Sequence, residues 1–507
     1  MIAELATVLA VFAGGCALLR ALGLSGWALP PLGFLAGACL LLDVGFLQLV
    51  TGAPTTPVLT LAAIVVLPLA WCVLRWRRGH DLRIPVPATI TTVVLLAVAV
   101  PVLRAANLVK WNMDSLDYLK AGRLLAEGGY RSTASTDLVV ERVLGVPLLH
   151  AAANLSGDFY LRSITPLLFI ALLAAMVWLL RAGIRAAGGR TPAARWSNAL
   201  IALAMLLLLT NDRVVYNAFY LNAHLLVAAL FVLIGAGGWL LAVWEEAPRP
   251  ALMALQLIAV PALVISRPEG ALLAVLLALP TVLSRRIDRR HRMVLLATLG
   301  GSVALFAGFQ AWLFHDRGTA IPVSVAGPAL LGVLALAAVP LLRLGFVHRH
   351  ADHLLWAAEA LLWLVLLAYT VRGPGVLYRS ARATYINQIR GTGAWGLFVV
   401  LLCVLLLVAM LLLRIPYQAH LRFPLTTFVP LVLVLAYVRE GAYRVGDADS
   451  LNRMIMHVVP LAVVYLLLLL TTGRLPARGE AADPPAGSDA AEDTSVLSGP
   501  TVRTAQK

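Results

Sequence analysis

The residues best suited to chemistry lie in a polar segment at residues 105–158. Asp114 and Asp117 are spaced by three residues there, and a lysine and an arginine continue the spacing. On a helix such side chains follow one another along one face, so one interpretation is a solvated ladder of ion pairs. The other interpretation is a catalytic role. Trp111 supports it, because tryptophan is typical of a membrane interface and places the neighbouring carboxylate there. A carboxylate beside it can act as a general base or hold a divalent metal, so Asp114, and after it Asp117, are the catalytic candidates.

Arginines gather in two further polar segments. Residues 371–394 hold four arginines and no acidic residue, and residues 438–453 hold three arginines among acidic residues. Arginine is the preferred partner of phosphate because its planar guanidinium donates hydrogen bonds in pairs. Both segments are therefore expected to bind a phosphate or pyrophosphate of a lipid carrier. The alternatives are contact with anionic headgroups, or a helix miscount that places these segments on the cytoplasmic side. The candidates are Arg372, Arg379, Arg382, Arg390 and Arg453.

A charged turn at Ser266–Gly270 interrupts a long apolar run. Proline and glycine break the helix, and charges this close to a membrane core are costly unless they are partnered. A tight hairpin with an internal Arg267–Glu269 pair would explain the charges. A role in substrate binding would also explain why a simple turn carries them.

An aromatic segment and two histidines complete the candidates. Tyr216 lies in a polar, aromatic stretch at residues 211–224, which fits a sugar-stacking surface or an interfacial aromatic belt. His224 and His457 each stand alone, and packing is the more frequent role of such a histidine. All three are kept as candidate substrate contacts.

The elements that must position these residues are apolar helices. The chain of 507 residues is 61% hydrophobic and 13% charged, whereas soluble domains are about a quarter charged. The composition predicts an all-α polytopic membrane protein. Fifteen segments near bilayer-spanning length lie at residues 4–23, 30–50, 57–74, 86–104, 159–180, 197–210, 221–243, 251–266, 270–284, 294–314, 322–342, 354–371, 394–413, 423–438 and 455–472.

Three basic loops set the expected topology. They lie at residues 75–78, 181–195 and 285–292, and an even number of predicted helices separates each from the next. By the positive-inside rule all three face the cytoplasm, which places residues 105–158 and 372–393 outside it. The same rule accounts for most of the net charge of +15 without a nucleic-acid partner. The first helix is expected to be retained, since no basic region or cleavage site marks it as a signal.

The expected organisation has three parts. They are N-terminal helices at 1–84, a catalytic core at 85–472 and a disordered cytoplasmic tail at 473–507. Within the external loop, residues 139–149 carry an apolar stripe that predicts an amphipathic helix lying in the membrane surface. A loop that packs on the bundle is the alternative.

Taken together, these motifs resemble the GT-C glycosyltransferases, polytopic enzymes that use polyprenyl-phosphate sugars as donors. The resemblance rests on Asp114–Tyr118 in the first large external loop, on Ser266–Gly270 and on Arg453–Pro460. It implies a GT-C-like bundle of about 13–15 transmembrane helices, with an extracytoplasmic loop that carries amphipathic helices. It also implies that Asp114 is the catalytic base. Many members have adjacent acidic residues at that place, whereas this chain spaces them by three, and three extra helices precede the part that resembles the core.

The expected function is inverting transfer of a sugar from a polyprenyl-phosphate donor to an extracytoplasmic glycan, lipid or protein acceptor, at the cell membrane. Asp114 would deprotonate the acceptor hydroxyl, and the arginines of residues 372–390, helped by Arg267, would stabilise the departing lipid phosphate. No cofactor is required by this chemistry, although a divalent metal is compatible with it. The alternatives are a transporter or flippase of a lipid-linked or anionic solute, and a polysaccharide polymerase or ligase.

Overall fold

Helices make up the regular structure of this chain. The computed structural model describes residues 2–53, 56–79, 83, 85–106, 113–128, 143–157, 161–188, 192–316, 318–391, 393–438 and 453–475. In those ranges every regular element is a helix, and an isolated β-bridge joins Arg414 to Arg474. The prediction of an all-α protein is therefore confirmed.

The helices before the charged turn are α1 (Ile2–Ala21), η1 (Gly26–Ala28), α2 (Leu29–Thr51), α3 (Pro57–Arg77), α4 (Val86–Ala106), α5 (Met113–Ala126), α7 (Gly145–Ala151), η3 (Ala152–Ser156), α8 (Ile164–Ala186), η4 (Pro192–Trp196), α9 (Ser197–Thr210), α10 (Asp212–Phe219), α11 (His224–Phe231), η5 (Val232–Ala236), α12 (Gly237–Val243) and α13 (Arg249–Val264).

Those after the turn are α14 (Gly270–Leu283), α15 (Arg289–Asp316), α16 (Val323–Ala338), η6 (Val339–Arg343), α17 (Gly345–Arg349), α18 (Ala351–Arg372), α19 (Pro374–Thr384), η7 (Tyr385–Ile389), α20 (Phe398–Leu412), α21 (Ala419–Val438), η8 (Ile455–His457) and α23 (Val459–Thr472). The segments η5 and η7 are π-helical turns that continue α11 and α19.

The chain is a multi-pass membrane protein. Among the described residues, nine helices are long and apolar enough to cross a bilayer, and α9 with α10 forms a further candidate that bends by 67°. Five shorter apolar helices have 10–17 residues. Each of the fifteen predicted segments coincides with one of these helices. The apolar side chains that the outer helices expose, such as Leu67, Val93 and Leu361, suit contact with lipid.

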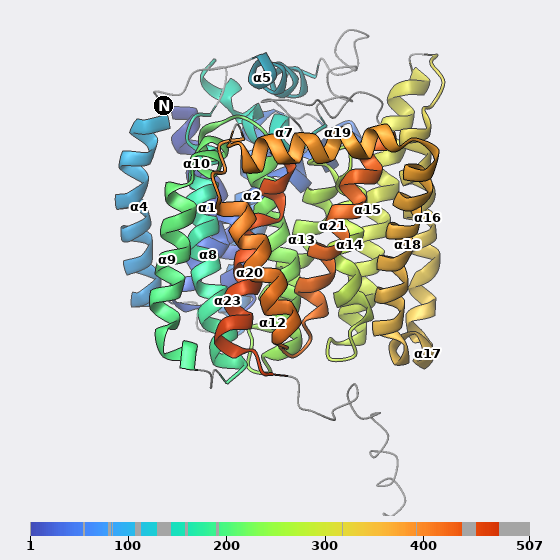
Figure 1. Cartoon of the computed structure of the whole chain (residues 1–507). Coiled ribbons are helices and arrows are strands. Elements are labelled where there is room, and N and C mark those ends of the chain that lie inside the picture. Colours follow the sequence, from blue (N-terminus) through green and yellow to red (C-terminus); the bar gives the residue numbers. More distant parts are fainter. Residues whose placement is uncertain are drawn as a thin grey trace, which may run out of the picture.

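The long helices stand side by side, whereas α5 and α19 lie across one end of the bundle (Figure 1). We call this the α5 end; α7 packs against α5 there, and the N-terminus lies at the same end. At the opposite end lies α17. Arg292 and Arg285 contact His348 of α17 there, so we call it the basic end. Segments predicted to lie on opposite sides of the membrane therefore lie at opposite ends of the molecule.

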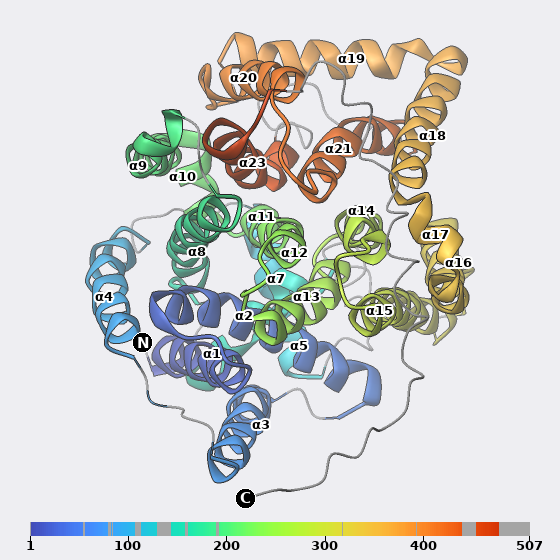
Figure 2. The same cartoon turned by 90° about the horizontal axis from the view of Figure 1, so that it is seen from below.

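One span occupies the centre of the bundle. It consists of α11, η5 and α12, and its residues are almost completely buried by the helices around it (Figure 2). Gln256 of α13 donates to Ile234 O of the π-helical turn at 3.0 Å and meets His291 at 2.9 Å. A Cβ atom on Gly238 would lie 2.3 Å from the Thr281 hydroxyl, so only glycine lets this network form. The network fixes the central span near the basic end.

The N-terminal helices belong to the same packed bundle. α2 packs against α8 and α13, and Phe46 meets the ring edges of Phe306 and Phe309 on α15. The cytoplasmic tail predicted at 473–507 lies outside the described residues from residue 476 onward.

The predicted interfacial helix at residues 139–149 requires a correction. Residues 139–142 lie outside the described residues, and the apolar residues from Val143 to Leu149 are buried in the protein. They pack between α5 and the charged turn, so this part packs on the bundle as the alternative held, although residues 145–149 belong to the helix α7. Their apolar character reflects protein neighbours, because lipid-facing side chains would be exposed on the surface of the chain.

Candidate functional site

The charged turn between α13 and α14 is buried and internally paired. Arg267 Nε lies 2.8 Å from Glu269 Oε1, and Glu269 is only 2% exposed. The Gly270 amide donates to Arg267 O at 2.9 Å, which closes the turn after α13 ends at Val264. The internal ion pair that would explain a simple hairpin is therefore present, and the role of the turn in substrate binding stays a prediction. A buried pair of this kind places two charges at a fixed point of the α5 end.

The turn is joined to α7 by backbone contacts. The amides of Leu144 and Gly145 both donate to Ile265 O at 3.0 Å. A Cβ atom on Gly145 would lie 2.6 Å from the Ser266 hydroxyl, so this approach needs a glycine. The start of α7 is thus fixed directly on the charged turn.

Helix α5 packs in turn on α7. Gly122 lies so close to Pro147 that an added Cβ would come within 2.7 Å of the Pro147 carbonyl oxygen. Asp117 is half-buried in the second turn of α5. Asp114 lies in the first turn, and its side chain is outside the described part of the structure. Carboxylates at a helix N-terminus also stabilise the helix dipole, so this position suits them structurally as well as chemically.

Two histidines that stand alone in the sequence form a pair in space. His224 Nδ1 lies 2.9 Å from His457 Nε2, and the two side chains are 4% and 0% exposed. The rings of Phe231 and Phe428 pack against His457. A hydrogen bond between two imidazoles needs one N–H and one free lone pair, so at least one facing nitrogen is unprotonated. The prediction that each acts as a lone packing residue is therefore incomplete.

Charged groups surround this pair. Arg213, Arg267 and Arg453 lie close enough to His224 to act on it electrostatically. Arg267 and Glu269 also lie close enough to His457 to act on it electrostatically. A buried histidine pair beside several guanidinium groups favours a ligand that brings negative charge.

Helix α10 contributes Arg213, which was not among the sequence candidates. Its side chain is 8% exposed, and its Nε donates to Gly393 O at 2.7 Å. Asn211 caps α10 by accepting from the amides of Arg213 and Val214, and it also donates to Trp395 O at 3.0 Å. An Asn–Asp–Arg sequence at a helix start is a capping signal that could have drawn attention to this arginine.

Tyr216 lies on the exposed side of α10. It is 43% exposed and stacks on Tyr220 with ring centroids 4.8 Å apart. The Arg213 guanidinium lies 5.4 Å from the Tyr216 ring centroid. This aromatic pair could stack against a sugar ring or lie among lipid headgroups.

The four arginines of residues 372–390 do not lie beside the histidine pair. Arg372 ends α18, Arg379 and Arg382 belong to α19, and Arg390 follows η7; all four are exposed. α19 lies along the rim of the bundle between α18 and α20 (Figure 2). The structure therefore brings together Arg267, Glu269, His224, Arg453 and His457, and leaves the other arginines at the edge.

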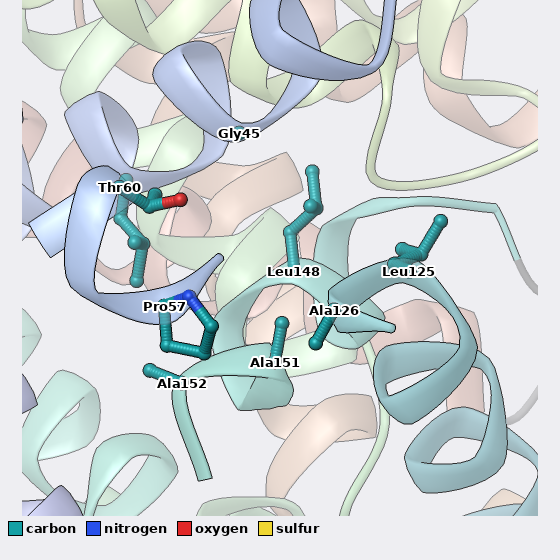
Figure 3. A pocket seen from close by; sticks show the side chains of 9 residues that line it. Gly45, Pro57, Thr60, Leu125, Ala126, Leu148, Ala151 and Ala152 are labelled. Atoms are coloured by element: carbon teal, nitrogen blue, oxygen red, sulfur yellow. The ribbon is translucent and has the colours of Figure 1, made fainter. Parts of the chain in front are cut away.

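A small cavity lies beneath α5 and α7 (Figure 3). Its volume of about 10 Å³ is close to the room that one water molecule needs. Thr60 supplies a hydroxyl to an otherwise apolar lining, and that hydroxyl already donates to Gln48 Oε1 at 2.7 Å. The cavity is far too small for a sugar.

No group of three or more His, Cys, Asp or Glu side chains suited to a metal occurs in the described ranges. Comparisons with protein-family models, with curated proteins and with solved structures found no match to this chain.

Proposed function

We propose that the chain is a membrane glycosyltransferase that moves a sugar from a polyprenyl-phosphate donor to an acceptor at the α5 end. The observation that supports this most is the convergence at that end of three segments far apart in the sequence. The Arg267–Glu269 turn, the His224–His457 pair and Arg453 form one buried cluster, and α7 connects the turn to α5 with its carboxylates.

The chemistry assigns one role to each part. Asp114, or Asp117 next to it, takes the proton from the acceptor hydroxyl as the oxygen attacks the anomeric carbon. The bond between that carbon and the phosphate oxygen breaks, and the electron pair leaves with the lipid phosphate. Arg267 and Arg453 are the candidates to stabilise that charge, because fixed cations act strongly in a site shielded from water.

Transfer assays on purified protein test this proposal. Wild type and Asp114→Asn would be incubated with a panel of polyprenyl-phosphate sugars and candidate acceptors, with Asp117→Asn as the second variant. The control is Glu127→Gln, which removes an exposed carboxylate at the other end of α5. We expect transfer by wild type and the control, and a loss of about 100-fold or more in the variant that lacks the base. Full activity in both aspartate variants would contradict the assignment of the base.

A transporter of an anionic or lipid-linked solute is the second candidate, and one contact favours it. Arg422 of α21 lies 2.8 Å from Glu359 of α18, and both side chains are nearly buried within membrane-spanning helices. Charged residues at such positions often mark a solute or ion path. Absence of transfer from every donor, together with uptake of a labelled solute by vesicles, would replace the transferase proposal. A polymerase or ligase would instead transfer a whole lipid-linked oligosaccharide rather than a single sugar.

A further inference from the structure

Helix α19 runs along the rim of the bundle at the α5 end. Together with η7 it forms a continuous helical segment from Pro374 to Ile389 that connects α18 with the loop before α20 (Figure 1). The long helices stand upright, whereas α19 lies across their ends. A helix in this orientation at the edge of a membrane bundle lies at the level where lipid headgroups meet water.

The inner face of α19 is fixed to the bundle. Ser380, Ala383 and Asn387 follow one another at helical spacing, and all three are buried. The Leu377 amide donates to the Tyr437 hydroxyl of α21 at 3.2 Å, and that hydroxyl donates to Thr370 of α18 at 3.3 Å. These contacts set which face of the helix points outward.

The outer face is cationic and aromatic. Tyr378 and Tyr385 are 69% and 50% exposed, and the exposed arginines 372, 379, 382 and 390 accompany them. Residues 371–394 contain no acidic residue, and the described part of the chain offers none of these four arginines a carboxylate partner. Arg379 donates to Gly375 O of its own helix, and Arg390 lies over the Tyr385 ring. The described surroundings leave the positive charge of this face without a counter-charge.

We propose that this outer face of α19 is a docking surface for the headgroups of anionic phospholipids. Three of the arginines, at 379, 382 and 390, span about 16 Å along α19 and η7, at about 1.5 Å per residue, and Arg372 stands where α18 meets α19. Arginines near a membrane surface attract anionic lipid strongly, and exposed tyrosines prefer the headgroup level. Because the surface lies at the rim, it is separate from the buried cluster of Arg267 and His457. The inference rests on α19 alone and does not depend on the proposed transfer reaction.

Site-specific quenching tests the proposal. Ala381→Cys, an exposed position on α19, would carry a fluorescent label in a background in which the partly or fully exposed cysteines 16, 72 and 403 are replaced by alanine. The labelled protein is then placed in phosphatidylcholine vesicles that contain either brominated phosphatidylglycerol or brominated phosphatidylcholine. The ratio of the two quenching efficiencies reports enrichment of anionic lipid beside α19. We expect a ratio well above one, falling by up to about fivefold for each arginine that is replaced by glutamine.

The matched control removes the same number of positive charges at the opposite side of the membrane. Arg77, Arg78, Arg289 and Arg290 are exposed arginines predicted to lie at the opposite side of the membrane, and their replacement by glutamine should leave the ratio unchanged. Replacing the four exposed arginines of residues 372–390 by glutamine should reduce the ratio to one without shifting thermal unfolding, because none of them is buried.

A ratio of one in the unsubstituted protein would overturn the proposal. A high ratio that remains after all four arginines of residues 372–390 are replaced would overturn it too. Displacement of phosphatidylglycerol by trace polyprenyl phosphate would assign the surface to the donor lipid instead. The readout needs no enzymatic activity, so its result is distinct from that of the transfer assay.

Discussion

Replacing Arg267 by glutamine should destabilise the protein more than replacing its partner Glu269. The two side chains lie 2.8 Å apart but differ in burial, with Arg267 14% exposed and Glu269 fully buried. Without Arg267, a buried carboxylate loses the guanidinium that compensates it, which costs about 3–5 kcal/mol. Without Glu269, the partly exposed guanidinium can turn toward water, so the loss is closer to one charged hydrogen bond, about 1.5–3 kcal/mol.

The assay is unfolding in detergent, followed by tryptophan fluorescence. An exposed pair on α5 provides the matched control: Arg123 and Glu127 are also 2.8 Å apart, but their side chains are 56% and 47% exposed. Glutamine at either control position should cost at most about 1 kcal/mol. The double variant of Arg267 and Glu269 should be less destabilised than the sum of its singles, because it removes both charges.

Equal losses for the two single variants, or a larger loss for Glu269→Gln, would refute this reasoning. Either result would mean that a group other than Arg267 compensates the buried carboxylate. If the losses of unfolding free energy in the two single variants add up to the loss in the double variant, the two charges act independently despite their short distance.

Three further predictions concern the central span, the histidine pair and the topology. Gly238→Ala should destabilise the protein by about 1–3 kcal/mol, because its Cβ would collide with the buried network; Gly237→Ala, with open space at its Cβ, should be neutral or stabilising in the same unfolding assay. His457→Phe should destabilise the protein by about 1–3 kcal/mol in that assay, because it leaves the buried His224 Nδ1 without the partner that lies 2.9 Å away; an unfolding free energy equal to that of the wild type would exclude the hydrogen bond between the two rings. Single cysteines at Ala381 and Glu245, both exposed, should react with an impermeant thiol reagent from opposite sides of the membrane; labelling from one side would overturn the predicted topology.

The apolar helices could be predicted from the sequence because each depends only on its own run of residues. A run of about twenty apolar residues has few stable alternatives to a membrane-spanning helix. The charged turn could be found for the same reason, since Arg267 and Glu269 stand out against an apolar background. Exposed arginines on α19 were visible as a violation of the charge rule, although the sequence could not show which way they point.

The assembly of the site could not be predicted in the same way. His224 and His457 are separated by 233 positions, and no local pattern connects them. The prediction for the stretch from Val143 to Leu149 was wrong because an apolar stripe that contacts lipid has the same sequence pattern as one that packs on protein. Its burial follows from the contact of Gly145 with Ile265, which is a tertiary feature.

The central span also bears on the choice between transfer and transport. His224 at one end contacts His457, whereas Gly238, about 21 Å further along the helix, lies in the Gln256 network. Between them, the residues from Leu225 to Ala236 are all apolar and buried. A polar solute passing along this span would have to cross a dry stretch with no side chain to replace its hydration, at a cost of several kcal/mol. This packing therefore excludes a transport path along the central span, and a transporter would need a path elsewhere, such as beside the Arg422–Glu359 pair of α21 and α18.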